Sequence, residues 1–401
     1  MSRIDELIRE HCPDGVEYKT LDEVAKIIRG ERITKRDLIE NGKYPVMSGG
    51  TSFFGRYSKT NRKANTITIA QYGSAGYVSF ITEDFWANDV CYSVLPSNLV
   101  NNKYLYYVLC NNQRESYSLT TKAIPDCLPK ERLETITIPV PPLPVQEEIV
   151  RILDNFTELE AELEAELEAR RQQYEFYRNK LLNVEGRMLN VECRMQNVEW
   201  KRVKIIDVLA QPITDGPHET PQFYENGVPF LSAEAIVNNR LDFSHKRGFI
   251  SKDYDNQCAK KYKPRKNDVF MCKSGSTTGK VAINDSDEDF NIWSPLAAMR
   301  VNNEISARWL FHVLQTTDIQ KQVHENSSHG SQPNLSMRKL EQFEIPLPPL
   351  DVQERIVNVL DNFESLCNDL GIGLPAEIEA RRKQYEYYRN KLLSFTPPLF
   401  S

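Results

Sequence analysis

Two stretches of the chain show hydrophobic patterns that are typical of long amphipathic helices. In the first stretch, apolar residues follow one another in steps of 3, 4, 4, 7, 3 and 4: Phe156, Leu159, Leu163, Leu167, Tyr174, Tyr177 and Leu181. These steps form a heptad pattern with one four-residue stutter. The pattern predicts a long helix whose apolar stripe packs against a partner helix.

The second stretch carries a similar stripe with one additional step of four: Phe363, Leu366, Leu370, Leu374, Ile378, Tyr385, Tyr388 and Leu392. Gly371 and Gly373 predict a break in this helix, and Pro375 predicts the start of a new one. Because two similar stripes in one chain can bury each other, we expect an antiparallel coiled coil that separates the remaining parts of the chain.

The two stretches belong to an internal duplication. ITIPVPPLPVQEEIVRILDNF at 136–156 returns as FEIPLPPLDVQERIVNVLDNF at 343–363, and EARRQQYEFYRNKLL at 168–182 returns as EARRKQYEYYRNKLL at 379–393. Fainter matches precede both copies, such as YGSAGYV from Tyr72 and SGSTTGKV from Ser274. The chain therefore consists of a variable half and a helical arm, written twice.

The duplication predicts five segments and a mixed α/β fold with pseudo-twofold symmetry. They are the first variable half (1–137), the first arm (138–185), a linker with a tandem seven-residue repeat (186–199), the second variable half (200–344) and the second arm (345–401). A length of 401 residues, with 40% hydrophobic and 26% charged residues, is enough for two globular domains besides the arms.

The composition favours a soluble cytoplasmic protein without a structural metal. No apolar run approaches the roughly 18 residues of a membrane span, and the first residues lack the apolar core of a signal peptide. The eight cysteines are scattered without a C-x-x-C pair, and the six histidines are dispersed. This distribution favours reduced thiols and indicates neither a disulfide framework nor a zinc site.

Charge is distributed unevenly along the chain. The whole chain has a formal charge of -6, and the first arm alone has 5 Lys or Arg against 11 Asp or Glu. Within the variable halves, residues 26–63 and 240–280 each carry a net charge of +7. Matched basic segments in otherwise acidic surroundings favour nucleic-acid binding. The alternative is that both segments are ordinary solvated surfaces.

Three motif-like stretches do not indicate an enzyme. In SGSTTGKV, Gly275 and Gly279 are one residue too close for a phosphate-binding P-loop, and Val281 replaces its Ser or Thr. In PDGVEYK, only two residues separate Asp14 from Glu17, so the two carboxylates cannot lie on paired strands around a nuclease metal. The Pro-Pro pairs occur as VPPL, LPPL and TPPL, which lack the tetrapeptide of adenine methyltransferases.

The duplicated arm sequence, P-x-P-P-L-x-x-Q-E-x-I-V-x-x-L-D-N-F followed by E-A-R-R-x-Q-Y-E-x-Y-R-N-K-L-L, resembles the specificity subunit of type I restriction–modification systems. The resemblance covers essentially the whole chain. It implies two target-recognition domains that read a split, asymmetric DNA target. It also implies two adenine methyltransferase subunits and a restriction–translocase subunit as partners, which would carry S-adenosylmethionine, ATP and Mg²⁺. The chain itself would then need no cofactor and would catalyse nothing.

Within this resemblance, the arms would bind the methyltransferases and set the gap between the half-targets. The candidate docking residues are Tyr174, Tyr177, Arg178 and Lys180, with Tyr385, Tyr388, Arg389 and Lys391. For the tyrosines, packing within the helix pair is the alternative role. The sequence ELEA stands three times in succession at 158–169, and each unit would add about 6 Å of helix.

The candidate DNA-binding residues are polar and basic residues of the variable halves, which supply donors for phosphates and base edges. In the first half they are Lys35, Arg36, Arg56, Lys59, Arg62, Lys63, Tyr72, Ser74 and Lys122. In the second half they are Thr214, Asp215, Gly216, His218, Lys273, Ser276, Thr277, Lys280, Ser331 and Gln332. The competing hypothesis is a coiled-coil scaffold that joins two protein-binding domains and does not recognise DNA.

Overall fold

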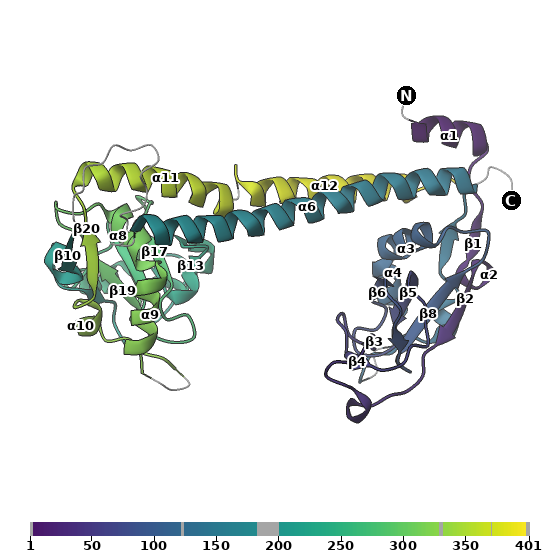
Figure 1. Cartoon of the computed structure of the whole chain (residues 1–401), viewed down its shortest axis with the longest axis horizontal. Helices are drawn as coiled ribbons and strands as arrows, with labels where there is room; N and C mark the ends of the chain where they lie inside the picture. Colours follow the sequence, from purple (N-terminus) through teal and green to yellow (C-terminus); the bar gives the residue numbers. More distant parts are fainter. Residues whose placement is uncertain (1–2, 122–123, 183–199, 329–331, 370, 398–401) are drawn as a thin grey trace. The chain divides into compact units, whose positions relative to one another are not determined.

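The chain has a mixed α/β structure in a computed structural model, which describes residues 3–121, 124–182, 200–328, 332–369 and 371–397 (Figure 1). The linker repeat predicted at 186–199 lies outside these residues. The chain divides into two compact units: unit 1 contains residues 1–163 and 378–401, and unit 2 contains residues 164–377. Each unit therefore holds one variable half with parts of both arms. No helix in the described part of the chain is long and apolar enough to cross a membrane.

Unit 1 is built around an antiparallel main sheet and a smaller mixed sheet. Its elements before the first arm are α1 (Arg3–His11), β1 (Tyr18–Thr20), α2 (Leu21–Val24), β2 (Ala25–Arg29), the 3-10 turn η1 (Lys35–Asp37), β3 (Tyr44–Met47), β4 (Gly55–Tyr57), β5 (Thr66–Ala70), β6 (Val78–Ile81), β7 (Trp86–Ala87), β8 (Cys91–Pro96), α3 (Asn102–Asn111), α4 (Gln113–Ser118), α5 (Lys130–Leu133) and β9 (Thr137–Pro139). The main sheet has the order β2-β8-β5-β6, a second sheet has the order β4-β3-β7, and β1 pairs with β9. The core of the unit includes the fully buried Tyr104, Leu105 and Leu109 of α3.

Unit 2 repeats this plan with additions. Its elements before the second arm are β10 (Lys201–Lys204), η2 (Ile205–Val208), β11 (Thr214–Asp215), β12 (Val228–Leu231), η3 (Ala233–Ala235), β13 (Ile236–Val237), β14 (Arg240–Leu241), η4 (Phe243–His245), β15 (Gly248–Ile250), α7 (Lys252–Ala259), β16 (Val269–Cys272), β17 (Val281–Ile283), β18 (Asn291–Ile292), β19 (Leu296–Met299), α8 (Ala307–Leu314), α9 (Thr317–Asn326), α10 (Met337–Leu340) and β20 (Glu344–Leu347). The order β11-β19-β16-β17 corresponds to β2-β8-β5-β6, and β14 and β13 extend it. The predicted duplication is therefore a duplication of structure.

One glutamine at the start of each arm fixes the proline-rich lead-in. The Gln146 side chain accepts a hydrogen bond from the Asn101 backbone N–H at 2.7 Å and donates to the carbonyls of Leu99 and Pro141 at 3.0 and 2.6 Å. Gln353, 207 residues later, makes the three equivalent bonds at 2.8, 3.3 and 2.8 Å. Both side chains are fully buried. Because an unpaired buried amide is costly, each glutamine holds the arm at one fixed position against its variable half.

The arms form three helices: α6 (Leu143–Leu182), α11 (Leu350–Asn368) and α12 (Leu374–Leu393). The predicted break in the second arm is confirmed, since α11 ends before Gly371 and α12 begins beside Pro375. A Cβ atom at Gly373 would lie only 2.6 Å from the Ser365 carbonyl oxygen, so the turn between the two helices needs glycine there.

The stripe of α6 differs from the predicted one. From Leu153 to Leu181 a row of buried and half-buried positions recurs in alternating steps of three and four residues without a stutter, with a few further half-buried positions beside it. Glu160 occupies one of these positions and forms an ion pair with Arg382, whereas Leu159 is 46% exposed. The predicted stutter is wrong because the prediction considered only apolar residues, and a charged pair fills the position.

The same correction applies to the second arm. Leu366, which is equivalent to Leu159, is 39% exposed, and Cys367 is fully buried in its place. The predicted stripe residue Leu370 lies outside the described residues. Both repeats thus leave one leucine of the predicted stripe exposed to solvent.

Aromatic side chains of the two repeats pack against each other inside each unit. In unit 1 the Phe156 ring lies 6.3 and 5.5 Å from the rings of Tyr385 and Tyr388. The equivalent distances in unit 2 are 6.5 and 5.9 Å, from Phe363 to Tyr174 and Tyr177. Each unit therefore contains a phenylalanine from one repeat and two tyrosines from the other. Since Glu160 pairs with Arg382, one turn beyond Phe156 and one turn before Tyr385, the helices run antiparallel in unit 1.

Buried titratable groups join the second arm to α8 in unit 2. The His312 ring is fully buried, with Nε2 at 2.7 Å from Asp361 and Nδ1 at 3.2 Å from the Tyr174 hydroxyl. Glu364 is 3% exposed and lies 3.4 Å from Arg308, and its Oε1 atom has no hydrogen-bond partner among the described residues. Burial raises the pKa of Glu364 to about 7, and the nearby Arg308 charge offsets only part of this effect.

The equivalent junction of unit 1 contains fewer titratable groups. Asp154 accepts a hydrogen bond from the Tyr107 hydroxyl at 2.6 Å and pairs with Lys103 at 2.6 Å. Thr157 occupies the position of Glu364, and its hydroxyl donates to the Asp154 carbonyl at 2.8 Å. The two units therefore share the aspartate and the cation but differ in the buried acid.

Replacement of Glu364 by glutamine tests whether the raised pKa of this buried carboxyl makes the stability of unit 2 depend on pH. A carboxyl whose pKa is higher in the folded than in the unfolded chain stabilises the fold below its unfolded pKa, and this stability is lost as the pH rises through the folded pKa. For the shift at Glu364 the loss between about pH 5 and about pH 8 is on the order of 3 kcal/mol. The free energy of unfolding of unit 2, measured with urea, should therefore fall over this pH range in the wild type and fall much less in Glu364→Gln. Parallel pH profiles for the two proteins would contradict the assignment.

Candidate nucleic-acid interface

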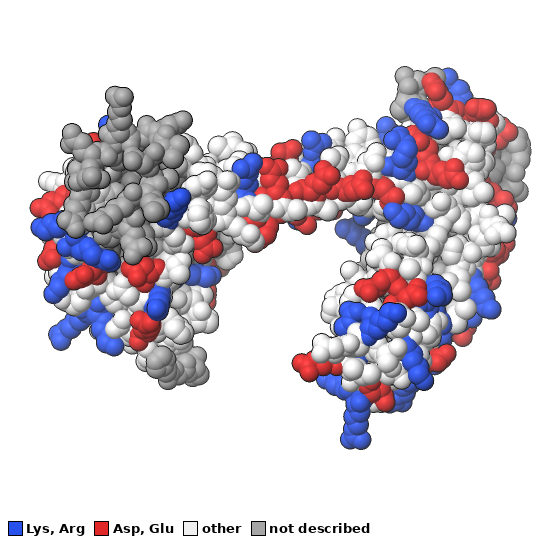
Figure 2. Space-filling view, viewed as in Figure 1, with Lys and Arg blue, Asp and Glu red and all other residues white. Residues whose placement is uncertain are grey.

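Basic side chains of unit 1 gather around η1 and the second sheet. Lys35 and Arg36 form the η1 turn, Arg56 lies on β4, and Lys59 follows that strand; all four are exposed. Lys63 is also exposed and lies 3.1 Å from Asp84. Figure 2 shows Lys and Arg side chains over the end of unit 1 that carries β3 and β4. Five of the predicted DNA-binding residues are thus exposed on the surface of unit 1.

Two predicted arginines of unit 1 also hold the fold. The Arg56 guanidinium donates to the carbonyls of Gly42 and Lys43 at 2.6 Å each. All three nitrogen atoms of Arg62 donate within the unit, to Ser93 Oγ, to the Asn61 carbonyl and to the Arg29 carbonyl. Three of the five N–H groups of Arg62 are therefore used within the unit, and no carboxylate among the described residues neutralises its charge.

The turn between β5 and β6 carries Tyr72 and Ser74. Ser74 donates its backbone N–H to the Gly49 carbonyl at 2.8 Å, so the turn packs closely on the loop after β3. Gly73 has φ +81°, and a Cβ atom there would lie 2.6 Å from the Gly49 oxygen. Tyr72 and Ser74 are half-buried and flank this close approach. Lys122 lies outside the described residues.

The turn between β16 and β17 is its counterpart in unit 2. Gly279 N–H donates to the Cys272 carbonyl at 2.8 Å, as Gly76 N–H donates to the Ala70 carbonyl at 2.8 Å in unit 1. Ser276 and Lys280 are exposed on the turn. The half-buried Thr277 instead turns its hydroxyl to Cys272 Sγ at 3.1 Å. Gln332 is exposed, and Ser331 lies outside the described residues.

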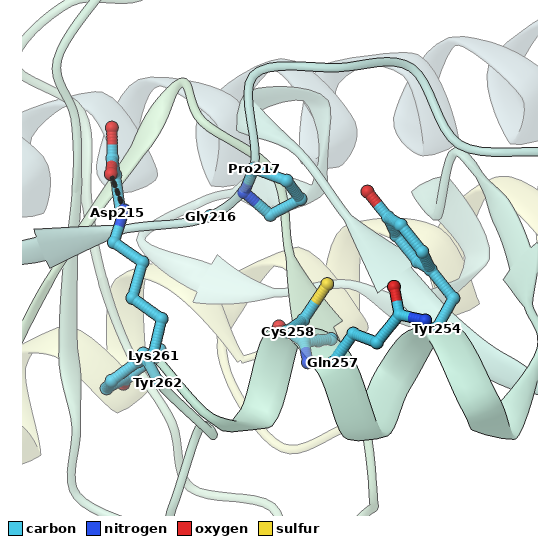
Figure 3. Close-up of a pocket in the computed structure, with 9 residues that line it drawn as sticks. Asp215, Gly216, Pro217, Tyr254, Gln257, Cys258, Lys261 and Tyr262 are labelled. Carbon is cyan, nitrogen blue, oxygen red and sulfur yellow. Dashed lines mark hydrogen bonds and ion pairs between the residues drawn. The ribbon is translucent and has the colours of Figure 1, made fainter.

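At the end of β11, Asp215 lies close to two lysines and a histidine; Figure 3 shows its ion pair with Lys261. Its Oδ1 atom lies 2.6 Å from Lys261 Nζ, and its Oδ2 atom lies 3.2 Å from Lys273 Nζ and 3.3 Å from His218 Nε2. Burial alone would raise the pKa of Asp215, but the two lysines outweigh it and hold the pKa below its ordinary value. With 2% of its surface exposed, Asp215 positions these side chains rather than reaching a ligand itself.

The residues around Asp215 shape the same turn. A Cβ atom at Gly216 would lie only 1.9 Å from the Ile292 carbonyl oxygen, so glycine is required there. Thr214 is half-buried, Lys273 is 9% exposed, and His218 is exposed with its Nδ1 at 2.9 Å from Ser294 Oγ. Of the predicted residues in this turn, His218 is the exposed one. Lys261 was missed by the sequence analysis, because its partner lies 46 residues away and no local signal marks the pair.

A cavity of about 240 Å³ lies between this turn and α7. Pro217, Tyr254, Gln257 and Cys258 line it together with the Asp215–Lys261 pair (Figure 3). Its volume is below the roughly 300 to 1,000 Å³ of small-molecule and cofactor sites. We therefore assign no cofactor to it.

On the arms, the predicted docking tyrosines are largely used in packing. Tyr174 is 5% exposed, Tyr177 and Tyr385 are half-buried, and Tyr388 is 36% exposed. Arg178 and Arg389 lie over the rings of Tyr174 and Tyr385 at 5.1 and 5.4 Å. The packing role that was the alternative for the tyrosines is therefore present in the structure. Lys180 and Lys391 are exposed.

Two exposed aromatic residues that were not among the predicted docking residues lie beside these positions. Phe176 is 59% exposed and Tyr387 is 61% exposed, and they are repeat-equivalent, 211 residues apart. Tyr387 belongs to unit 1, as Leu159 does, and Phe176 belongs to unit 2, as Leu366 does, so each unit has a repeat-equivalent exposed leucine and a repeat-equivalent exposed aromatic ring on its arm helices. The signal available in the sequence was an aromatic residue at the same place in both copies.

One group of possible metal ligands occurs in the described part of the chain: His312, Asp361 and Glu364, with ligand atoms within 4.8 Å of one another. Arg308 lies 3.8 Å from Asp361 and 3.4 Å from Glu364. Because this guanidinium already supplies a positive charge to both carboxylates, the group is better described as an ion-pair network.

Comparisons with known proteins agree with this architecture. The family "Type I restriction modification DNA specificity domain" matches the chain twice, at residues 13–169 and 197–380. A protein of Haemophilus influenzae named as a type I restriction enzyme specificity subunit is 32% identical over 399 residues, which cover 95% of this chain and 96% of that protein. The EcoR124I/EcoR124II specificity subunit of Escherichia coli is 30% identical over 423 residues, which cover 99% and 98%.

Two solved structures share the fold. The S subunit of a type I restriction–modification system from M. genitalium has a TM-score of 0.57 at 19% identity and covers 94% of this chain and 96% of that one. A chain from a structure describing complex assembly and conformational transition of the type I system has a TM-score of 0.60 at 15% identity and covers 95% and 98%. Each family match spans one variable half and most of the arm that follows it, as the duplicated structure does. The chain therefore belongs to the family of type I restriction–modification DNA specificity subunits.

Proposed function

We propose that this chain recognises a split, asymmetric DNA target and positions adenine methyltransferase subunits on it. The observation that carries the proposal is that the main sheets of both units have the same strand order but carry different residues in their turns. The β5–β6 turn presents Tyr72 and Ser74, whereas the equivalent β16–β17 turn presents Ser276 and Lys280. Equivalent positions with different side chains suit two different half-targets, because base edges are distinguished by the donors and acceptors that meet them.

In this proposal the chain performs no chemistry. Methylation belongs to the methyltransferase subunits, which would bind S-adenosylmethionine. DNA cleavage would belong to a restriction–translocase subunit that uses ATP and Mg²⁺. The complex would act in the cytoplasm. This division of roles rests on family membership and on the absence from the sequence of an adenine methyltransferase tetrapeptide.

We propose that the methyltransferases dock on Phe176 and Tyr387, the exposed neighbours of the predicted tyrosines. Phe176 and Tyr387 are more than half exposed on helices whose other aromatic residues are packed. Aromatic residues are enriched among the side chains that dominate binding energy at protein interfaces. Because the same aromatic position recurs in both units, it suits two copies of one partner. Lys180, whose Nζ lies 5.6 Å from the centre of the Phe176 ring, borders the surface in unit 2.

The proposed gap-setting role rests on the regular seam of α6. The ELEA units lie inside one uninterrupted helix, where four residues contribute about 6 Å of length. This length corresponds to somewhat under two base pairs at about 3.4 Å per base pair. The arms would thus set the distance between half-targets, while the turns of the two units would set their sequences.

A methylation map tests the function as a whole. We expect co-expression with the neighbouring methyltransferase subunit in a methylation-free host to modify adenines within a bipartite motif that has a fixed gap. The measurement is genome-wide detection of N6-methyladenine. Methylation of a short continuous motif, or none despite a stable complex, would favour the scaffold hypothesis instead.

Deletion of one ELEA unit tests the gap. The expected result is a motif whose gap differs by one or two base pairs and whose half-targets are unchanged, because the recognition turns are untouched. The same methylation map measures it. The matched control is Leu159→Ala, which keeps the length of the helix and should keep the gap. Altered half-targets with an unchanged gap would contradict this role.

Replacement of the exposed aromatic residues tests docking. We expect Phe176→Ser or Tyr387→Ser alone to reduce the number of bound methyltransferases from two to one, and the double variant to bind none. Each loss should be at least about 2 kcal/mol, roughly 30-fold in Kd. Native mass spectrometry gives the stoichiometry. The matched control is the exposed pair Glu175→Ser and Glu386→Ser, which occupies the preceding repeat-equivalent positions. Two bound copies in the aromatic double variant would refute this surface.

A further inference from the structure

The two variable halves have the same formal charge excess in sequence, but the structure treats their cations differently. Residues 26–63 and residues 240–280 each carry +7. Whether such a segment attracts a polyanion depends on the carboxylates that the fold places beside it, since charges separated by more than about 8 Å are screened at physiological salt. Ion pairs therefore decide the effective charge of each segment.

In unit 2 the segment is largely neutralised. Seven of its eleven basic residues form ion pairs: Arg240, Arg247, Lys252, Lys261, Lys263, Lys266 and Lys273. The carboxylates that neutralise them from outside the segment are Asp215, Glu234, Asp287, Asp289 and Asp369. These five carboxylates reduce the local charge from +7 to +2. Figure 2 shows blue and red side chains side by side on unit 2.

A four-residue network shows how tightly these pairs are built. Lys263 Nζ lies 2.6 Å from Asp255 and 2.6 Å from Asp289, and Lys252 Nζ lies 2.9 and 2.8 Å from the same two carboxylates. Asp255 is 1% exposed. A phosphate could attract one of these lysines only by taking it away from the buried Asp255, which is costly.

In unit 1 the segment keeps nearly all of its charge. Of its ten basic residues, Lys63 has an ion pair, with Asp84 at 3.1 Å. For the other nine no ion pair is found among the residues that the structure describes: Lys26, Arg29, Arg32, Lys35, Arg36, Lys43, Arg56, Lys59 and Arg62. Arg29, Arg56 and Arg62 bind carbonyl oxygens, which leaves their charge in place. Counting Asp84, the local charge remains +6.

We infer that the first variable half supplies most of the sequence-independent attraction to the DNA backbone, and that the second binds its half-target mainly through contacts that depend little on salt. This inference rests on the proposed function. A cation that is unpaired in the free protein neutralises a phosphate and releases a condensed counterion, which steepens the salt dependence of binding. A cation that already holds a carboxylate releases none unless that pair is broken.

The salt dependence of DNA binding tests the inference. The full chain would be titrated with a duplex that contains both half-targets, over about 50 to about 200 mM NaCl, with fluorescence anisotropy as the readout. We expect Lys35→Gln, Arg36→Gln and Lys59→Gln together to reduce the slope of log K against log salt by roughly 2 to 3, at about 0.9 per phosphate contact. All three side chains are exposed, so we expect folding to be unaffected.

The matched variant removes two ion pairs of unit 2 without changing its charge: Arg247→Gln with Glu234→Gln, and Lys266→Gln with Asp287→Asn. We expect its slope to equal that of the wild type. A slope reduced by about 2 would show that these cations exchange their carboxylates for phosphates, and would overturn the inference. An unchanged slope in the unit 1 variant would overturn it as well. If the wild type does not bind the duplex at any salt concentration, the proposed function fails rather than this division of charge.

Discussion

The packing of each phenylalanine against the other repeat's tyrosines is the contact on which the architecture depends. Phe156 needs Tyr385 and Tyr388, and Phe363 needs Tyr174 and Tyr177. Because a single amphipathic helix in water is stabilised mainly by burying its apolar face, neither arm would be stable alone. Each compact unit is therefore completed by a piece of the other repeat. The gene duplication is visible in the structure as an exchange of helices between repeats.

Much of this arrangement could be predicted from the sequence. The heptad spacing, the shift of 207 residues and the glycines at 371 and 373 sufficed for the helices, the duplicated unit and the break. The prediction failed at Leu159 and Leu366, where the repeat puts a leucine outside the seam. Apolar periodicity cannot recognise a seam position that is filled by a pair such as Glu160 with Arg382, because the two residues are 222 positions apart.

The candidate interface was predictable in outline and not in detail. The sequence analysis selected the segments that form the turns, since glycine, serine and lysine cluster there. It could not distinguish a residue that reaches a ligand from one that holds the turn together. Asp215 and Lys273 are buried against each other, and Arg62 is bonded within its unit. The net charge of a segment did not predict its charge in the fold for a related reason. Lys252 pairs with Asp289, 37 residues away, and Lys266 pairs with Asp287, 21 residues away.

The two repeats agree in one class of residue and differ in another. The apolar and hydrogen-bonding contacts that hold the arms recur almost position by position, as in Gln146 and Gln353 or Phe156 and Phe363. Several charged and titratable groups do not: Thr157 stands where Glu364 is buried, and most cations of residues 26–63 have no ion pair among the described residues, whereas most of those of residues 240–280 do. A partner that binds the arms would therefore meet two similar surfaces, whereas a ligand of the variable halves would meet two different ones. Since the two properties rest on separate residues, the recognition turns can change without disturbing the contacts that join the repeats.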